Sequence, residues 1–389
     1  MSHIGDDSQN VKFIYWDNLT YAPPGSRDPE KWDARLGAQI YETYLGHCVE
    51  AERLGYAGLS MPEHFGPSSL VTHPNIMLAA LAARTTRARI VSGVNLALLH
   101  NPLHLAEQFA MIDVLSGGRL EVGLGRRGDR AAFEHAADLV DGVLNGIDHP
   151  VEKADLTPAL APFAQDVDTA RVTVWPRPVQ ERVPLWVAAE TDGSLATAAR
   201  RGWNVFTGLN LDPSAGGMSK VSVEDMVARL HRYFEIGQEN EHALSMANVA
   251  ASCFTVIADT DKEAAEIVRD GFASHVEAAG GHLARLSGAG PAAGALETLA
   301  KEGDTGVQGL FDAPADSYLR NPFALVGSVE TVKAKLDALM SAGFRRFVLL
   351  CGGVGNAHEV GWQSATAMAT DVAPGLFSAA TSGPGEAAA

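Results

Sequence analysis

The sequence predicts an α/β fold built as a single (β/α)8 TIM barrel, and two observations support this. Short apolar runs alternate with longer stretches of helical periodicity along the 389-residue chain, a pattern typical of parallel strands joined by crossover helices. The apolar run occurs eight times, which matches the eight units of one barrel. A doubly wound open sheet fits less well, because it usually has fewer strands and, at this length, a second domain.

Each strand and helix is predicted from its own residues. The eight apolar runs expected as strands are Val11–Trp16, Ala57–Met61, Arg89–Val94, Leu120–Leu124, Leu185–Ala188, Asn204–Thr207, Val249–Ala258 and Phe344–Leu350. A helix is expected after each of the first seven strands and one more before the last, over Leu36–Leu54, Ile76–Thr85, Pro102–Leu115, Ala131–Leu144, Leu195–Arg201, Val223–Ile236, Thr260–His275 and Val329–Ala342. Glycines such as Gly55 and Gly202 end helices, and Ser328 is suited to start one.

Three segments fall outside this rhythm. Residues 146–182 carry five prolines and are expected to be mostly loop, with Arg171–Trp175 as a short edge strand. Residues 278–316 are rich in glycine and alanine and too long for an ordinary connection, so they form either a lid or a partly disordered insertion. Residues 374–389 read as a disordered tail. The barrel domain is therefore expected over residues 1–373, with 278–316 as an insertion within it.

Composition excludes several classes of function. The chain has 30 basic and 47 acidic residues, a net charge of −17, which disfavours a nucleic acid or an anionic membrane surface as the main partner. The three cysteines are far apart and form no CxxC pair, which argues against a zinc site or a disulfide framework. We find no signal peptide and no apolar run of about 18 residues, and the expected location is the cytoplasm.

One phosphate site is predicted after the fourth strand. Gly123, Gly125 and Gly128 fit G-x-G-x-x-G, but a dinucleotide fold would carry this pattern after its first strand, with an acidic residue ending a second strand about 20 residues on. The glycines could simply let the strand pack and turn. The stronger interpretation is a phosphate site with Arg126 as its cation, because a guanidinium matches phosphate oxygens with two parallel hydrogen bonds.

A second anion site is predicted between the fifth strand and its helix. Unpaired amides at a helix N-terminus favour a phosphate, and the hydroxyls of Thr191 and Ser194 can add donors. The alternative is that Ser194 or Asp192 merely caps the helix. Glu190 and Asp192 count against an anion unless their side chains point away.

Taken together, these stretches resemble the bacterial-luciferase-like, flavin-dependent monooxygenases. The most specific block runs from Asn101-Pro102 to Gln108 and on from Ile112 to Arg126. Further similar stretches are Ala51–Tyr56 followed by Glu63-His64, Arg177–Gln180 with Pro184–Ala189, and Val326–Ser328 with Gly343-Phe344. The resemblance extends from about Val11 to Gly353. It implies a single barrel with a mobile insertion before the last strand, which suits residues 278–316.

The resemblance also implies a function. It implies a monooxygenase that uses reduced FMN and O2 to oxygenate a small organic substrate through a flavin peroxide, by hydroxylation or Baeyer–Villiger insertion. Reduced flavin would come from a separate NAD(P)H-dependent reductase, and the chain would form a homodimer through its second and third helices. The alternatives are an oxidoreductase of the same fold that uses the deazaflavin F420, favoured by the extra cation Arg127, and a barrel that binds flavin without catalysis.

Residue roles follow from the same resemblance. Arg126 matches the arginine that grips the flavin phosphate, and the phosphate loop corresponds to Glu190, Thr191 and Ser194. His64 matches the histidine near the flavin that acts as base or hydrogen-bond donor. Two further positions, Val94 and Asn95, lie where the third strand meets the isoalloxazine edge. The sequence departs from the luciferases in having Gly125 in place of a cysteine and Phe65 in place of a second histidine.

Each of these residues also has a structural interpretation. His64 could be a core histidine bonded to a backbone carbonyl. His100 and His104 have metal-like spacing, but Pro102 lies between them and no third ligand is evident. A buried ion-pair network is expected for Glu107, Asp113 and Arg119. Four aromatic residues could stack on a flavin or simply pack in the core: Trp16, Tyr21, Trp186 and Phe206.

Overall fold

The computed structural model describes most of the chain. The described residues are 11–21, 32–64, 69–126, 128–156, 169–209, 211–212, 217–218, 222–271, 315–352 and 358–381. The predicted insertion at 278–316 lies outside them, apart from its last two residues. Arg127 and Phe65 also lie outside.

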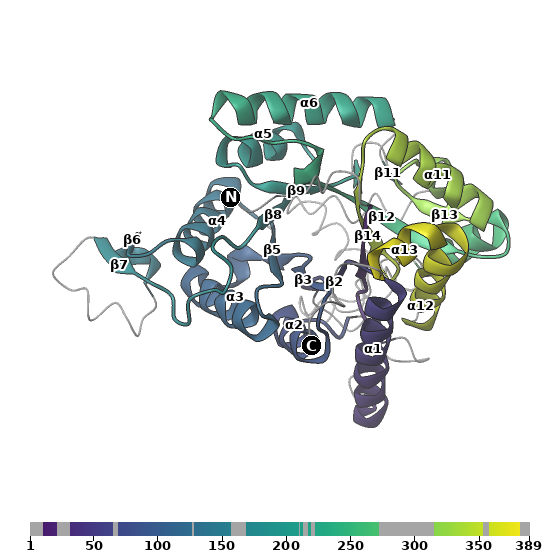
Figure 1. Ribbon diagram of the computed structural model, residues 1–389, viewed down its shortest axis with the longest axis horizontal. Coiled ribbons are helices and arrows are strands. Elements are labelled where there is room, and N and C mark those ends of the chain that lie inside the picture. The colour runs from purple at the N-terminus through teal and green to yellow at the C-terminus, as the bar shows by residue number, and fades with distance from the viewer. Residues whose placement is uncertain are drawn as a thin grey trace, which may run out of the picture.

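Eight parallel strands close into a barrel, as the sequence predicts (Figure 1). They are β1 (Lys12–Trp16), β2 (Gly58–Met61), β3 (Arg89–Ser92), β5 (Leu120–Gly125), β8 (Leu185–Ala188), β9 (Asn204–Thr207), β12 (Val249–Ile257) and β14 (Arg346–Leu350). Each strand pairs with the next in this order, and β14 pairs with β1 to complete the ring. All eight predicted strands are confirmed, and so is the single-barrel fold class.

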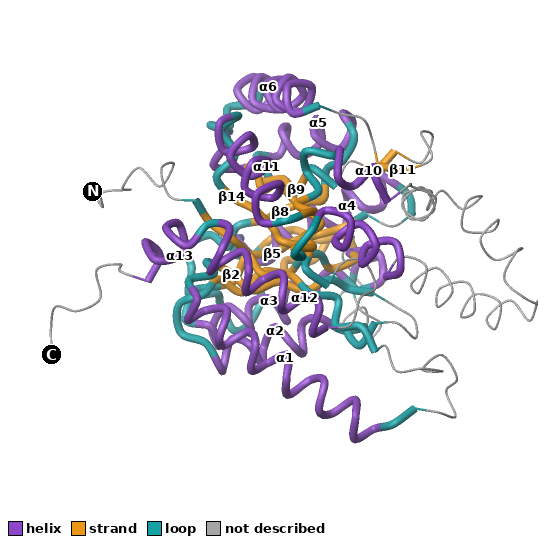
Figure 2. Tube along the Cα trace, turned by 90° about the vertical axis from the view of Figure 1, so that its right-hand side faces the viewer, coloured by secondary structure: helices purple, strands orange, loops and turns teal. Residues whose placement is uncertain are grey.

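Helices surround this barrel (Figures 1 and 2). They are α1 (Ala34–Leu54), α2 (Pro74–Arg84), α3 (Pro102–Ser116), α4 (Arg130–Asn145), α5 (Asp192–Arg201), α6 (Val223–Glu239) and α11 (Val329–Ser341), and residues 261–271 are also helical. Their starts follow local chemistry, since the side chains of Asp33, Asn101 and Ser328 accept hydrogen bonds from the first-turn amides of α1, α3 and α11.

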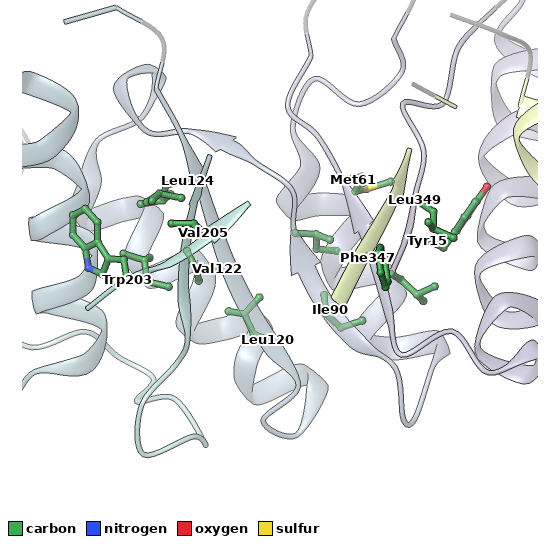
Figure 3. Packing of buried hydrophobic residues seen from close by; sticks show 14 of the residues in the cluster. Tyr15, Met61, Ile90, Leu120, Val122, Leu124, Trp203, Val205, Phe347 and Leu349 are labelled. Carbon is green, nitrogen blue, oxygen red and sulfur yellow. The ribbon is translucent and has the colours of Figure 1, made fainter. Parts of the chain in front are cut away.

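The alternation of side chains along each strand produces two cores. Tyr15, Ile90 and Val122 face outward and pack beneath the helices (Figure 3), whereas Val91 and Trp186 belong to a separate cluster that fills the barrel interior. Successive residues of a strand point to opposite faces, so each strand supplies both cores. The residues at the end of each strand therefore divide between the barrel mouth and the helix layer.

Several elements are absent from the sequence prediction. A hairpin of β6 (His149–Glu152) and β7 (Thr169–Val172) lies within the proline-rich segment, where β7 overlaps the predicted edge strand. Shorter additions are β4 (Asn95–Leu96), β10 (Leu211–Asp212), β11 (Gly217–Met218), α10 (Ala315–Arg320), β13 (Leu325–Gly327) and α12 (His358–Ala367), which continues as a π-helix over Met368–Val372. Most are too short to carry a periodic signal.

The predicted disordered tail at 374–389 needs correction at its start. Helix α13 spans Pro374–Thr381, and residues 382–389 lie outside the described range. Phe377 explains the order, because its buried ring stacks on Phe13 of β1 with the centroids 4.6 Å apart. A single aromatic residue in a Gly/Ala-rich stretch anchors the helix against the barrel, and composition alone does not reveal this.

The predicted ion-pair network is wrong. Buried Asp113 accepts hydrogen bonds from the backbone amides of Val179 and Gln180, and Arg119 donates to backbone carbonyls, among them that of Ala88. Glu107 is exposed on α3. Backbone groups therefore satisfy the charges of Asp113 and Arg119, and these two residues tie loops to the barrel wall.

The cysteines are free thiols in the protein interior. Cys48, Cys253 and Cys351 are buried and unpaired, and burial raises the pKa of each thiol, so none has the character of a reactive thiolate. No helix in the described part of the chain is long and apolar enough to span a membrane.

Candidate functional site

The candidate site lies at the rim where the parallel strands end. All barrel strands run the same way, so the residues after their C-terminal ends meet at one mouth. Asn18 follows β1, His64 follows β2, Val94 follows β3, Arg126 follows β5 and Glu190 follows β8. The structure therefore brings the predicted site residues His64, Val94, Arg126 and Glu190 to one rim, together with Asn18, which the sequence analysis did not single out.

The two predicted phosphate-binding elements lie next to each other. Strands β5 and β8 pair in parallel with Leu124 opposite Val187, so Arg126 and the loop that begins at Ala189 leave adjacent strands at the same level. Arg126 is exposed, and its guanidinium donates to the carbonyl of Gly128 at 2.9 Å. Its charge is thus available at the rim beside the start of α5.

The start of α5 has a capping box. The Thr191 hydroxyl accepts from the Ser194 amide at 3.2 Å, and the Ser194 hydroxyl accepts from the Thr191 amide at 3.0 Å. Capping by this pair is therefore confirmed, although the cap residue is Thr191 rather than Ser194 or Asp192. The amides of Asp192 and Gly193 have no partner within the helix and are left at its positive end.

Two arginines that the sequence analysis did not single out lie at this helix end. A Cβ atom placed on Gly193 would lie 3.4 Å from the guanidinium of Arg130, the first residue of α4. Arg229 of α6 binds the Asp192 carboxylate at 2.7 Å and the Glu190 carbonyl at 2.8 Å. The sequence could have indicated Arg130, because it directly follows Asp129, the cap residue of α4. It could not have indicated Arg229, because Arg229 is remote in sequence from the α5 loop.

The acidic side chains of the loop have partners of their own. Asp192 is held by Arg229, and a carboxylate oxygen of Glu190 lies 3.4 Å from the amide of Leu209. The objection that these acids would repel an anion is thereby reduced. The donor set, with guanidinium groups and helix amides around a glycine, fits a phosphate group.

His64 is exposed at the mouth of the barrel. Its Nδ1 lies 2.7 Å from the side-chain oxygen of Asn18. Its ring meets that of Trp16 edge-on, with the centroids 6.1 Å apart. The interpretation of His64 as a core histidine bonded to a backbone carbonyl is therefore wrong. The imidazole is oriented by a side chain at the rim.

The two predicted flavin-edge positions behave differently. Val94 is half-buried, and its side chain covers Gly125 so closely that a Cβ atom there would lie 2.4 Å from Val94 Cγ2. The side chain of buried Asn95 instead lines a pocket with Asn75 of α2 and Gln108 of α3, outside the barrel. Only the backbone of Asn95 therefore remains a candidate flavin contact.

His100, a histidine with metal-like spacing to His104, is hydrogen-bonded to Glu63. The buried Glu63 carboxylate lies 2.7 Å from His100 Nε2 and accepts from the Leu96 amide at 2.7 Å. No group of three or more His, Cys, Asp or Glu residues able to hold a metal ion occurs among the described residues. The interaction with Glu63 accounts for His100 without a metal.

The candidate aromatic residues are all buried. Tyr21 packs against Trp32, and Trp186 stacks on Phe206 inside the barrel with the centroids 5.1 Å apart. Among the described residues, the Trp186 Nε1 atom is nevertheless a buried donor without a partner, and so is the Ser60 hydroxyl. The packing interpretation is correct for these rings, and the barrel interior retains two unused polar groups.

This fold and rim define a (β/α)8 barrel with cationic side chains and an oriented histidine at its C-terminal mouth. Residues 28–346 match the family described as luciferase-like monooxygenases, and the chain belongs to that family.

Known relatives are distant. The oxygenase component of the flavin-dependent trigonelline monooxygenase of Acinetobacter baylyi is 24% identical over 243 residues, which cover 60% of this chain and 63% of that protein. The chain thus spans less than two thirds of that relative's length.

Solved structures share the fold at low identity. Monooxygenase RslO1 of Streptomyces bottropensis has a TM-score of 0.65 at 22% identity, over 94% of this chain and 99% of its own. The oxygenating constituent of 3,6-diketocamphane monooxygenase of Pseudomonas putida, solved with FMN, has a TM-score of 0.63 at 19% identity, with the same coverage. The F420-dependent tetrahydromethanopterin reductase of Methanopyrus kandleri reaches 0.59 at 18%, again with the same coverage.

Proposed function

We propose that the chain is a monooxygenase that uses reduced FMN and O2 to oxygenate a small organic substrate, by hydroxylation or by Baeyer–Villiger insertion. Family membership supports a flavin-dependent oxidoreductase, and the trigonelline and diketocamphane relatives are monooxygenases. The observation that carries the proposal is the adjacency of Arg126 to the amide end of α5 on neighbouring strands.

Different residues of this chain would bind the FMN phosphate, border its ring, transfer a proton and exclude water. Arg126, Arg130 and the α5 amides would hold the FMN phosphate, and Val94 with the backbone of Asn95 would border the ring. When bound, reduced FMN supplies the electrons that activate O2. His64 would hold or move a proton at the mouth, while the buried aromatic floor of Trp16 and Trp186 excludes water from below.

Replacing Arg126 tests this proposal. Loss of one charge-assisted contact is expected to weaken FMN binding by about 10- to 100-fold in R126A. Riboflavin, which has no phosphate, should bind the variant and the wild type equally. Anaerobic fluorescence titration with reduced and oxidised FMN measures both affinities. R232A is the matched control, because Arg232 is an exposed arginine of α6 paired with Glu235, and its FMN affinity should not change.

Equal FMN affinity in R126A and R232A would contradict the proposed phosphate site. The same titration with F420 tests the second candidate, an F420-dependent oxidoreductase. The specific observation in its favour is a second guanidinium group, that of Arg130, beside Gly193 at the start of α5, because more than one cation suits a longer anionic tail. Tighter binding of F420 than of FMN would favour it. If the protein binds FMN but the bound reduced FMN reacts with O2 at the same rate as free reduced FMN, a non-catalytic barrel is favoured.

Reduced flavin would come from a separate NAD(P)H-dependent reductase. The trigonelline relative is named as the oxygenase component of its monooxygenase, which supports a division between two proteins. The described residues form one barrel and contain no second nucleotide-binding fold. We also propose a homodimer, formed through α2 and α3.

A further inference from the structure

We propose that Asn18 is a positioning residue that keeps the proton of the neutral His64 imidazole on Nδ1, so that Nε2 is the proton acceptor at the barrel mouth. This inference deepens the proposed function and rests on it for the role of His64. It concerns the chain's own residues, and its main test does not require flavin.

The contact between the two side chains determines the tautomer. Asn18 is only 2% exposed, and its side-chain oxygen lies 2.7 Å from His64 Nδ1. An amide oxygen can only accept a hydrogen bond, so the ring nitrogen that meets it must be the one that carries the hydrogen. In the neutral ring the other nitrogen, Nε2, then has a lone pair and no hydrogen.

The corner after β1 holds Asn18 in place. The buried Asp17 carboxylate accepts the Leu19 amide at 2.7 Å across this corner, and Leu19 has a φ of 49°, a left-handed conformation that leucine rarely adopts. The Asn18 carbonyl accepts from the Ser69 hydroxyl at 3.2 Å. The corner is thus fixed from both sides, and it turns Asn18 toward the mouth and Asp17 toward the helix layer.

The outward side of the corner is anchored too. Asp17 also accepts from the Tyr15 hydroxyl at 2.9 Å and lies 2.8 Å from His358 Nδ1. These partners occupy the Asp17 carboxylate and keep it away from His64. The neutral amide of Asn18, rather than a carboxylate, is therefore the group that faces the imidazole.

This arrangement defines one proton transfer. Nε2 of neutral His64 forms a new N–H bond with a proton from the substrate or from water, and the donor keeps the electron pair of the bond that breaks. The ring becomes an imidazolium while Nδ1–H stays on the Asn18 oxygen. No reorientation of the ring is needed, because the hydrogen bond to Asn18 is present before and after the transfer.

The test is nitrogen NMR of the full chain without flavin, with 15N-labelled histidine and H64Q to assign the His64 signals. At alkaline pH the wild type is expected to show a protonated Nδ1 and an unprotonated Nε2. N18D should keep this tautomer and raise the pKa of His64 by about one unit or more, because a carboxylate favours the imidazolium. N18L should move the proton largely to Nε2.

An Nε2–H tautomer in the wild type, or unchanged signals in N18L, would overturn the inference. If N18L does not fold, the wild type and N18D still decide it, since the two side chains have nearly the same shape and an Nε2–H tautomer in either protein would contradict the inference. A separate measurement addresses the proposed function. If H64Q reoxidises bound reduced FMN at the wild-type rate across pH, His64 has no part in the chemistry even where the tautomer is as proposed.

Discussion

At the scale of single residues, the most consequential charge lies at the end of the barrel opposite the site. Glu121 is 4% exposed, and its carboxylate binds Arg89 Nε at 2.9 Å and also contacts the Arg346 guanidinium. Arg346 in turn lies over the Trp186 ring, 4.5 Å from its centroid. One carboxylate thus compensates two arginines at the starts of β3 and β14.

E121Q is expected to lower the free energy of unfolding by about 2–3 kcal/mol, because it leaves the charge of two half-buried arginines uncompensated. Chemical denaturation followed by circular dichroism measures this change. E42Q is the control, since it removes an exposed partner of Arg84 and should leave stability nearly unchanged. Equal stability of the two variants would show that the Glu121 contacts contribute nothing net. FMN affinity should be unaffected in both, because Glu121 lies far from the rim.

Residue roles are predictable from the sequence where a motif precedes them in the chain. The place of Arg126 at the rim could be predicted because it follows a glycine pattern at a strand end, and the place of the α5 loop because hydroxyl and glycine residues precede a helix, while their role in binding phosphate stays a prediction. Arg229 could not, because it reaches the loop from the next helix. The orientation of Asn95 toward the helix layer depends on a bulge after β3 that no residue pattern announces.

At the scale of elements, a chain of hydrogen bonds connects α1, α12 and the end of β1. His47 Nδ1 lies 2.7 Å from His358 Nε2, and His358 Nδ1 lies 2.8 Å from Asp17. His358 is 3% exposed and His47 is half-buried, stacked on Trp362. One line of contacts thus leads from solvent to the corner that holds Asn18.

Burial, and then the nearby His358, lower the pKa of His47 below its usual 6.5. The unfolded chain therefore binds more protons just below pH 6.5, and folding stability is lost as the pH falls through this window. Denaturation of H47Q between pH 5 and 8 should show a smaller loss on acidification than the wild type. His135 gives the opposite control, because its hydrogen bond to Asp155 raises its pKa.

H135Q should therefore be less stable than the wild type below pH 6.5, where the contribution of His135 is present. The two proteins should become equally stable as the pH rises and this contribution disappears. If both variants changed the pH profile in the same direction, burial of His47 and the hydrogen bond of His135 could not be the causes of the two pKa shifts. Both histidines are partly exposed, so the effects are expected to be small and best read as differences in slope.

Helices and strands are predictable where burial of one face makes apolar residues recur at a regular spacing in the sequence. The eight strands and their helices are long enough for apolar periodicity to mark them. Helix α12 could not be predicted, because its hold on the barrel depends on polar contacts of His358 rather than on an apolar stripe. For α13 the one informative residue is Phe377, and its partner Phe13 is more than 300 positions away.

At the scale of the whole molecule, the outer surface of α2 and α3 is unusually apolar. Ile76 of α2 is 71% exposed, and Met111 and Leu115 of α3 are 52% and 57% exposed. Met111 and Leu115 are four residues apart and share one face of α3, and α2 packs beside α3. Large exposed apolar side chains on two neighbouring helices are typical of a protein–protein interface, which supports the proposed homodimer.

Sedimentation equilibrium is expected to give twice the mass of the 41.0 kDa chain. The double variant M111E/L115E should be monomeric, because two charges in an apolar interface core weaken association by at least about 100-fold. I147E is the matched control, since Ile147 is 74% exposed and follows α4, outside both α2 and α3, and it should stay dimeric. A monomeric wild type, or a dimeric double variant, would contradict the interface. FMN titration of the monomeric variant then shows whether the rim works in one chain, as the location of Arg126, α5 and His64 within a single barrel leads us to expect.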